Sequence, residues 1–215
     1  MKRRILEVQE RVMPGYTGQA FAWGNSKLPQ STLIVNLTSA KHCPSKARGL
    51  CKVADVCYAI DCEELYKYYL PKNLFVEKWL YQTPSNIIIE LMTAYLRYAP
   101  EQITCIRLNE AGDFIHQNQI VQWNRIAQYF YQTFGIVTYT YTARIDLDYT
   151  VAPYIIVNGS LPGIAGAIRQ YYCVPPAFFD NYTPGPNEFK CPADCTRCNV
   201  CSTRNFKGIV YCRRH

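Results

Sequence analysis

Residues 103–142 have the sequence ITCIRLNEAGDFIHQNQIVQWNRIAQYFYQTFGIVTYTYT, which predicts a strand, a helix and a second strand. Ile103–Leu108 and Ile136–Thr142 are rich in the β-branched and aromatic residues that strands favour. Between them, from Gln117 to Thr133, apolar residues recur every three or four positions, as in an amphipathic helix. Gly135 suits the left-handed C-cap of that helix. A helical crossover of this length predicts that the two strands pair in parallel.

The same alternation continues on both sides of this unit. Leu33–Leu37 and Tyr154–Val157 predict further buried strands. Helices are expected at residues 59–69, 73–81 and 87–98. The first thirty residues contain so many prolines and glycines that we expect an irregular entry segment without a long helix.

These elements predict an α/β fold with an open or partial barrel-like parallel sheet. A full eight-fold barrel takes about 250 residues, and this chain has 215. We expect an α/β domain over residues 1–172, with a cysteine-bearing loop at 39–57. Residues 173–215 are predicted to form a cysteine-rich, irregular C-terminal segment packed on that domain.

Charge and hydropathy exclude several classes of protein. Lysine and arginine number 23 against 16 acidic residues, a net charge of +7 that permits contact with nucleic acid without requiring it. No apolar run reaches the roughly 18 residues that a membrane span needs. The first ten residues also lack the apolar core of a signal peptide. We therefore expect neither membrane association nor secretion.

Eleven cysteines, an odd number without an export signal, point to metal ligands and away from disulfides. Cys191, Cys195, Cys198 and Cys201 have the spacing C-x3-C-x2-C-x2-C, which is the known ferredoxin run in reverse. Structural zinc sites more often use two C-x2-C pairs separated by a longer loop. This local density favours an iron–sulfur cluster, of the 4Fe-4S type, with zinc as the alternative.

A second group, Cys43, Cys51 and Cys57, lies in the loop that follows the first predicted buried strand. Three cysteines can hold a cubane cluster with one iron open to a small ligand. Cys62 or His42 could instead complete a closed site, or the two cysteine groups could share one centre. The remaining cysteines, Cys105, Cys173 and Cys212, are interpreted as small apolar residues. Cys212 lies near enough in sequence to the C-terminal group that it could replace one of its ligands.

Polar residues follow several of the predicted strands, where ligands gather in parallel sheets. Asp113 and Arg144 are candidates for catalysis as well as for binding a cofactor or substrate. Asp113 could equally be a turn residue that binds its own backbone, and Arg144 an ordinary surface arginine. The candidate cofactor-binding residues are Asn109, Asp113, Arg144, Asn158 and Ser160.

Other enzyme classes find little support in the sequence. It contains no phosphate-binding P-loop, no dinucleotide-binding glycine fingerprint and no H-E-x-x-H zinc motif. The G-x-S-x-G nucleophile motif is also absent. With three histidines in the chain, a hydrolase built on a nucleophile and a histidine base is not expected.

These motifs together resemble the phage "gene product 88" family over roughly residues 33–215. The resemblance rests on Cys43-Pro44, Cys51 and Cys57-Tyr58-Ala59, on Arg107 with Asn109 and Gly112-Asp113-Phe114, on Trp123, on Tyr141-Thr142-Ala143-Arg144, and on Cys191-Pro192, Cys195, Cys198, Cys201 and His215. It implies a phage protein that acts in the cytoplasm of an infected bacterial host.

The first cysteine loop also resembles, more distantly, that of the radical S-adenosylmethionine enzymes. Those enzymes place three cysteines after the first strand of a partial α/β barrel. Here the spacing is C-x7-C-x5-C where theirs is C-x3-C-x2-C, and the aromatic Tyr58 follows the third cysteine where theirs precedes it.

The sequence thus predicts a phage-encoded iron–sulfur cluster-binding protein with a small-molecule ligand near the cluster. Whether it is a redox or radical-type enzyme is left open. The alternative is a zinc-stabilised phage protein with a nucleic-acid-binding or structural role.

Overall fold

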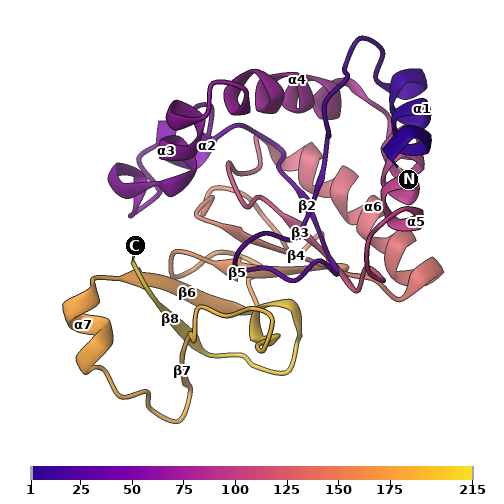
Figure 1. The fold of residues 1–215 in the computed structure, drawn as a ribbon. Helices are drawn as coiled ribbons and strands as arrows, with labels where there is room; N and C mark the ends of the chain where they lie inside the picture. Colours follow the sequence, from indigo (N-terminus) through magenta and orange to yellow (C-terminus); the bar gives the residue numbers. More distant parts are fainter. Residues whose placement is uncertain (1, 215) are drawn as a thin grey trace.

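The computed structural model describes residues 2–214 and confirms the α/β class. An open eight-stranded sheet runs through these residues in the order β1-β2-β3-β4-β5-β6-β8-β7 (Figure 1). β1 pairs with β2 in the antiparallel sense, and every pairing from β2 onward is parallel. The strands are β1 (Ala22–Trp23), β2 (Thr32–Val35), β3 (Cys105–Leu108), β4 (Val137–Thr142), β5 (Ile155–Gly159), β6 (Arg169–Val174), β7 (Glu188–Lys190) and β8 (Ile209–Arg213).

Helices pack on one face of the strands β2–β5 (Figure 1). The α-helices are α1 (Lys2–Val12), α2 (Pro44–Ala47), α3 (Tyr58–Leu65), α4 (Tyr69–Gln82), α5 (Ser85–Arg97), α6 (Gln117–Phe134) and α7 (Pro176–Asn181), and two 3-10 helices are η1 (Ala54–Val56) and η2 (Val200–Ser202). α5 contacts both α1 and α6, and α6 in turn contacts β4. α5 and α6 belong to the connections between successive parallel strands, so they cover the face of the sheet on which those connections pass.

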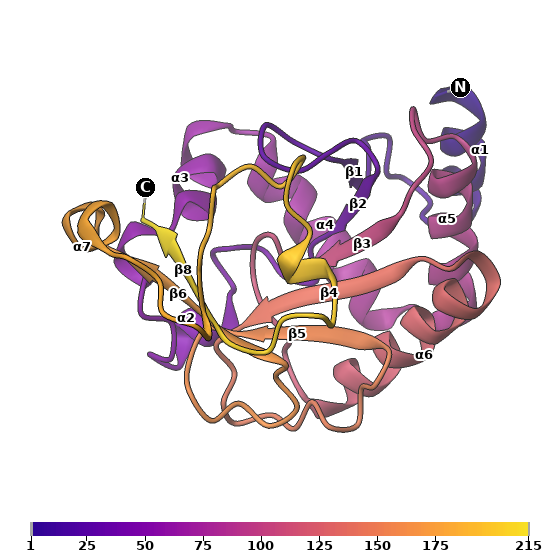
Figure 2. The ribbon, with the colours of Figure 1, turned by 90° about the horizontal axis from the view of Figure 1, so that it is seen from below.

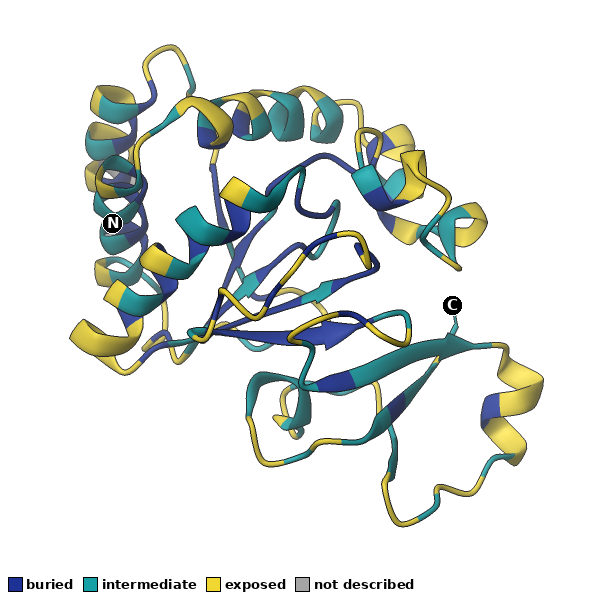
Figure 3. Cartoon of the chain, turned by 180° about the vertical axis from the view of Figure 1, so that it is seen from behind, coloured by how far each residue is buried: buried dark blue, intermediate teal, exposed yellow. Residues whose placement is uncertain are grey.

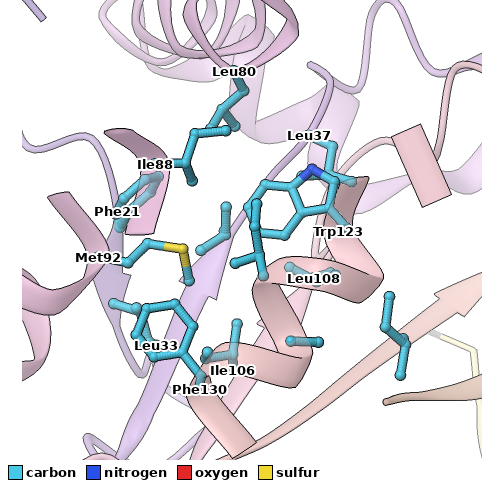
Figure 4. Packing of buried hydrophobic residues seen from close by; sticks show 14 of the residues in the cluster. Phe21, Leu33, Leu37, Leu80, Ile88, Met92, Ile106, Leu108, Trp123 and Phe130 are labelled. Carbon is cyan, nitrogen blue, oxygen red and sulfur yellow. The ribbon is translucent and has the colours of Figure 1, made fainter. Parts of the chain in front are cut away.

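The hydrophobic core lies between the sheet and these helices (Figure 4). It combines residues of the strands, such as Leu33 and Ile106, with residues of α5 and α6, such as Met92 and Trp123. The buried positions of α6 recur at the spacing that predicted it, and the helix ends at Gly135 with φ 69°. A glycine carries this left-handed conformation without steric cost.

The opposite face of the sheet carries a different set of side chains. Successive residues of a strand point to opposite faces, so Ile106 and Leu108 enter the core while Cys105 and Arg107 face the other way. The register of β3 and β4 sets Arg107 beside Tyr139. The C-terminal segment lies across this second face, and η2 contacts β4 and β5 (Figure 2).

Two expectations about local structure were wrong. The entry segment begins with the helix α1, since Pro14 and Gly15 lie beyond its last residue and Ile5 is buried in the core. The helix expected at residues 59–69 ends at Leu65, and α4 begins at Tyr69 with Pro71 in its first turn, where the missing N–H of proline costs nothing.

The C-terminal segment is more regular than its composition suggests. β6 runs through residues 172 and 173, where we expected the segment to begin. β8 then pairs with β6 over five residues, and β7 pairs with β8. These strands extend the open edge of the sheet by pairing with strands distant in sequence. The proline-rich local sequence does not predict such pairing.

Candidate metal centre

Four cysteines of the C-terminal segment line one cavity. Cys191, Cys195, Cys198 and Cys201 form part of the wall of a cavity of about 130 Å³. The strands supply the opposite wall with Tyr139, Tyr141 and Tyr171, together with Cys105. We call this space the C-terminal cysteine cavity. Cys105, interpreted from the sequence as a core residue, is thus a fifth thiol at the cavity.

Backbone and side-chain hydrogen bonds hold the cysteine loop over the sheet. The amide of Cys191 donates to the carbonyl of Tyr211 at 2.8 Å, and that of Cys195 donates to the carbonyl of Lys27 at 3.2 Å. Asn158 Nδ2 donates to the carbonyl of Cys201 at 3.1 Å. Arg169 Nη1 donates to Asn158 Oδ1 at 2.7 Å and fixes its orientation. The carboxyl end of β5 therefore anchors the loop.

Two arginines, Arg107 and Arg169, act electrostatically on the thiols of the cavity. The Arg107 guanidinium lies 3.8 Å from the ring centroid of Tyr141 and 5.3 Å from that of Tyr139. Burial raises the pKa of the Cys201 thiol to about 11, while a hydrogen bond with Tyr141 and the charges of Arg169 and Arg107 oppose that rise. Burial likewise raises the pKa of Cys195, and Arg107 opposes it. The arginines therefore favour the thiolate forms that bind metals.

The second cysteine group lies at the carboxyl end of β2. Cys43 is the N-cap residue of α2 and Cys57 that of α3, with Cys51 in the loop between these helices. Burial raises the pKa of Cys43 to about 11 and also raises that of Cys51. His42, an alternative ligand from the sequence, has Nδ1 at 3.1 Å from Glu77 Oε1. The other alternative, Cys62, lies in α3.

No three histidine, cysteine, aspartate or glutamate side chains within residues 2–214 converge closely enough to hold a single metal ion. All eleven cysteines are half-buried and free. The thiols of the C-terminal group are spread over the wall of their cavity. His215, part of the motif at the end of the sequence, lies outside the described residues.

Cys173 and Cys212 lie between the two groups. They are register partners on β6 and β8, and their Sγ atoms are 3.5 Å apart. The hydrogen bond with Cys212 and burial raise the pKa of Cys173, and the charges of Cys51 and Cys191, one from each group, raise it further. Its hydrogen bond to Cys212 lowers the pKa of Cys212 to about 7. The sequence interpreted Cys173 and Cys212 as small apolar residues, whereas in the structure their thiols interact with each other.

Asp113 connects the first cysteine loop to the sheet. Its carboxylate accepts hydrogen bonds from Ser45 Oγ at 2.6 Å and Thr142 Oγ1 at 2.8 Å, and from the amides of Phe114 at 2.8 Å and Ala143 at 3.0 Å. Burial raises its pKa, and the hydrogen bonds oppose that change. Asp113 is therefore the hub of a buried network.

The turn before Asp113 explains its placement. Gly112 has φ 77°, and a Cβ atom there would lie 2.1 Å from Thr38 Oγ1. The same Thr38 Oγ1 accepts a hydrogen bond from the amide of Asp113 at 2.9 Å. Only a glycine allows this close approach between the end of β3 and the segment after β2.

The other predicted ligand residues also bind protein groups. Arg144 is 1% exposed and forms a bidentate pair with Asp146, at 2.7 Å from Nε to Oδ1 and 2.9 Å from Nη2 to Oδ2. Asn109 Nδ2 donates to Thr140 Oγ1 at 3.4 Å. The amide of Ser160 donates to the carbonyl of Thr142 at 2.7 Å. These residues link the carboxyl ends of neighbouring strands.

Sequence reasoning missed the residues that complete the cavity. Tyr139 and Tyr141 of β4 line the cavity, and Arg107 of β3 and Arg169 of β6 act electrostatically on Cys201. The sequence predicted that β3 and β4 pair, but not that one face of these strands meets the C-terminal cysteines. The strict threonine–tyrosine alternation of β4 was a usable signal. It places all tyrosines of that strand on one face, opposite the threonines.

No helix in the described part of the chain is long and apolar enough to cross a membrane. No curated protein and no solved structure matches the sequence. A family model described as "Gene product 88" matches residues 9–162. The match includes the first cysteine group, Arg107 and Asp113, and it ends before the four cysteines of the C-terminal segment. With most of its length matched, the chain belongs to the gene product 88 family.

Proposed function

We propose that this protein binds an iron–sulfur cluster, most simply 4Fe-4S, in the C-terminal cysteine cavity. The observation that carries the proposal is that Cys191, Cys195, Cys198 and Cys201 all line the same cavity. Four thiolates are the ligand set of such a cluster. The cavity of about 130 Å³ is well above the roughly 10–15 Å³ that a cavity needs to hold one water molecule, so it offers more room than a single ion needs.

The arrangement of the thiols supports a cluster over zinc. A tetrahedral zinc ion draws four ligands to one point. A cubane cluster binds each thiolate through a different iron, so its ligands stand apart around a larger object. Cysteines distributed over a cavity wall match the second arrangement.

Arg107 and Arg169 support a redox role for the bound cluster. A cluster with four thiolate ligands is anionic, and its potential depends on net charge, hydrogen bonding and solvent exposure. Both arginines act electrostatically on Cys201, and Arg107 also acts on Cys195. Nearby cations stabilise the more negative, reduced state, so they would raise the reduction potential.

The first cysteine group extends the proposal to a second site. Cys43, Cys51 and Cys57 lie at the carboxyl end of a parallel strand, where ligands gather in such sheets. Three thiolates would leave one iron of a cluster open to a small molecule, which is the arrangement that redox or radical-type catalysis would use. Membership of the gene product 88 family supports a phage protein that acts in the cytoplasm of the infected bacterium.

The test is metal and acid-labile sulfide analysis, with a visible spectrum, of full-length protein purified without oxygen. We expect iron, sulfide and a visible chromophore. Cys195→Ser and Cys201→Ser should each lose most of the chromophore assigned to the cavity. Cys62→Ser is the matched control for the cavity, because Cys62 lies in α3 and is not part of the cavity wall, and it should keep the chromophore assigned to the cavity.

Two outcomes would overturn the proposal. Zinc without sulfide would replace it with a zinc-stabilised structural or nucleic-acid-binding role. Iron that survives both cavity substitutions would move the cluster away from the cavity. A triple serine variant at Cys43, Cys51 and Cys57 then tests the second site: we expect it to reduce iron and sulfide per chain while the cavity chromophore remains.

A further inference from the structure

We propose that Cys173 and Cys212 are a dithiol pair that forms a reversible disulfide with a low-molecular-weight disulfide as oxidant. The iron–sulfur proposal uses seven other cysteines as ligands and does not use Cys212, the possible substitute, so either proposal can fail without the other. The two Sγ atoms already lie 3.5 Å apart. Formation of the bond therefore needs a side-chain adjustment and no rearrangement of the strands.

The strand pairing holds the two thiols together. Cys173 and Cys212 are Cα partners within a continuous parallel register from Gln170↔Ile209 to Val174↔Arg213. Adjacent strands lie about 4.7–4.9 Å apart, within the 4.4–6.8 Å range of Cα separations in disulfides. Both residues are half-buried, so a small oxidant can reach the pair while the strands shield it in part.

The chemistry proceeds by two exchange steps that balance. The Cys212 thiolate attacks one sulfur of the oxidant, forms a mixed disulfide and releases one thiolate. The Cys173 thiol then loses its proton to solvent, and its thiolate attacks Cys212 Sγ and expels the second thiolate. Both protein thiols are thereby oxidised, and the oxidant is reduced to two thiols. The lowered pKa of Cys212 supports it as the attacking group.

The bond would close a loop around the C-terminal cysteine cavity. The two cysteines are 39 residues apart in the chain, and all four cavity cysteines of the C-terminal segment lie between them. Oxidation would therefore tie β8 to β6 at the base of the segment that carries those cysteines. The pair would couple the order of this segment to the thiol–disulfide balance of its surroundings.

The sequence allows an unambiguous test by peptide mapping. Trypsin releases the peptide 170–190 with Cys173 as its one cysteine, and the peptide 208–213 with Cys212 as its one cysteine. Full-length protein, purified without oxygen, is equilibrated with glutathione buffers of increasing glutathione disulfide content, then quenched with acid and alkylated. We expect the two peptides to appear as one linked species that dithiothreitol separates.

Variants distinguish this pair from nonspecific oxidation. Cys173→Ser should abolish the linked species and leave Cys212 as a mixed disulfide with glutathione, while Cys62→Ser should leave the link intact. The proposal is overturned if the two peptides stay unlinked while other thiols are oxidised. It is equally overturned if Cys212 links instead to Cys191, a cavity cysteine that interacts electrostatically with Cys212.

Discussion

The strands β2–β5 and the strands β6–β8 belong to one sheet but are stabilised in different ways. All five residues of β5 are buried, whereas one of the six residues of β6 is. The large buried cluster draws its members from residues 5 to 164, so it belongs to the first region (Figure 3). The first region holds together by apolar burial, and the second depends on strand pairing, side-chain hydrogen bonds and its cysteines.

This difference indicates which region depends on a metal or a disulfide for its stability. A region with a large apolar core folds without cross-links, whereas a small appended segment usually needs them. The cysteine cavity and the Cys173–Cys212 pair both lie where the chain has little core of its own. The predictions below test that division, from the largest expected effect to the smallest.

Removal of the Asp113 carboxylate should cause the largest loss. Asp113→Ala removes the acceptor of four buried donors, of which Thr142 Oγ1 keeps Tyr149 as a partner, and each orphaned group costs about 1–3 kcal/mol. We expect the free energy of unfolding to fall by about 5 kcal/mol, measured by urea denaturation. Asp113→Asn keeps one acceptor oxygen and should lose about half as much. A loss below about 1 kcal/mol for the alanine variant would contradict the network.

Substitution of a core aromatic residue tests the comparison directly. Trp123 is 1% exposed, whereas Phe178 of α7 is 47% exposed. Trp123→Ala should therefore lower the free energy of unfolding by about 4 kcal/mol. Phe178→Ala, in the second region, should lower it by less than about 1 kcal/mol. Equal losses in the two variants would show that the second region has a core comparable to the first.

Oxidation of the Cys173–Cys212 pair should stabilise the second region. Closing a loop of this length removes conformational entropy from the unfolded chain and contributes up to about 4 kcal/mol. Amide hydrogen exchange of β6 and β8 should slow on oxidation, while exchange in β3 and β4 should change little. In the Cys212→Ser variant, we expect the oxidant to leave the hydrogen exchange of β6 and β8 unchanged. Uniform slowing over the whole sheet would indicate that the two regions unfold together.

The pH dependence of the metal-free protein should be the smallest effect. The folded protein holds the pKa of Cys201 at about 11, above its ordinary value of 9.0. The folded state therefore keeps its proton where the unfolded state has released it, and stability falls as pH rises from about 9 to 11. The slope for one thiol is at most about 1.4 kcal/mol per pH unit. In the Cys201→Ser variant, the free energy of unfolding should depend less on pH between about 9 and 11. An unchanged slope would show that the Cys201 thiol does not cause this pH dependence.

Much of the fold was predictable because it depends on local periodicity. The helix α6 and the strands β3 and β4 lie within a residue or two of their predicted bounds. The helix α1 was missed because nearby proline and glycine dominated the local pattern, although they lie just beyond the end of the helix. β6 was missed because it pairs with β8, a strand far along the chain.

The sequence by itself determined the α/β class, the order of the central elements, the family and the density of thiols, because periodicity, composition and spacing are local properties. Only the tertiary structure decided which groups meet. It set Arg107 and the tyrosines of β4 against the C-terminal cysteines, made Asp113 the hub of a buried network and brought Cys173 to Cys212. These contacts join residues that are distant in sequence, and they depend on strand order and register, which no local pattern encodes.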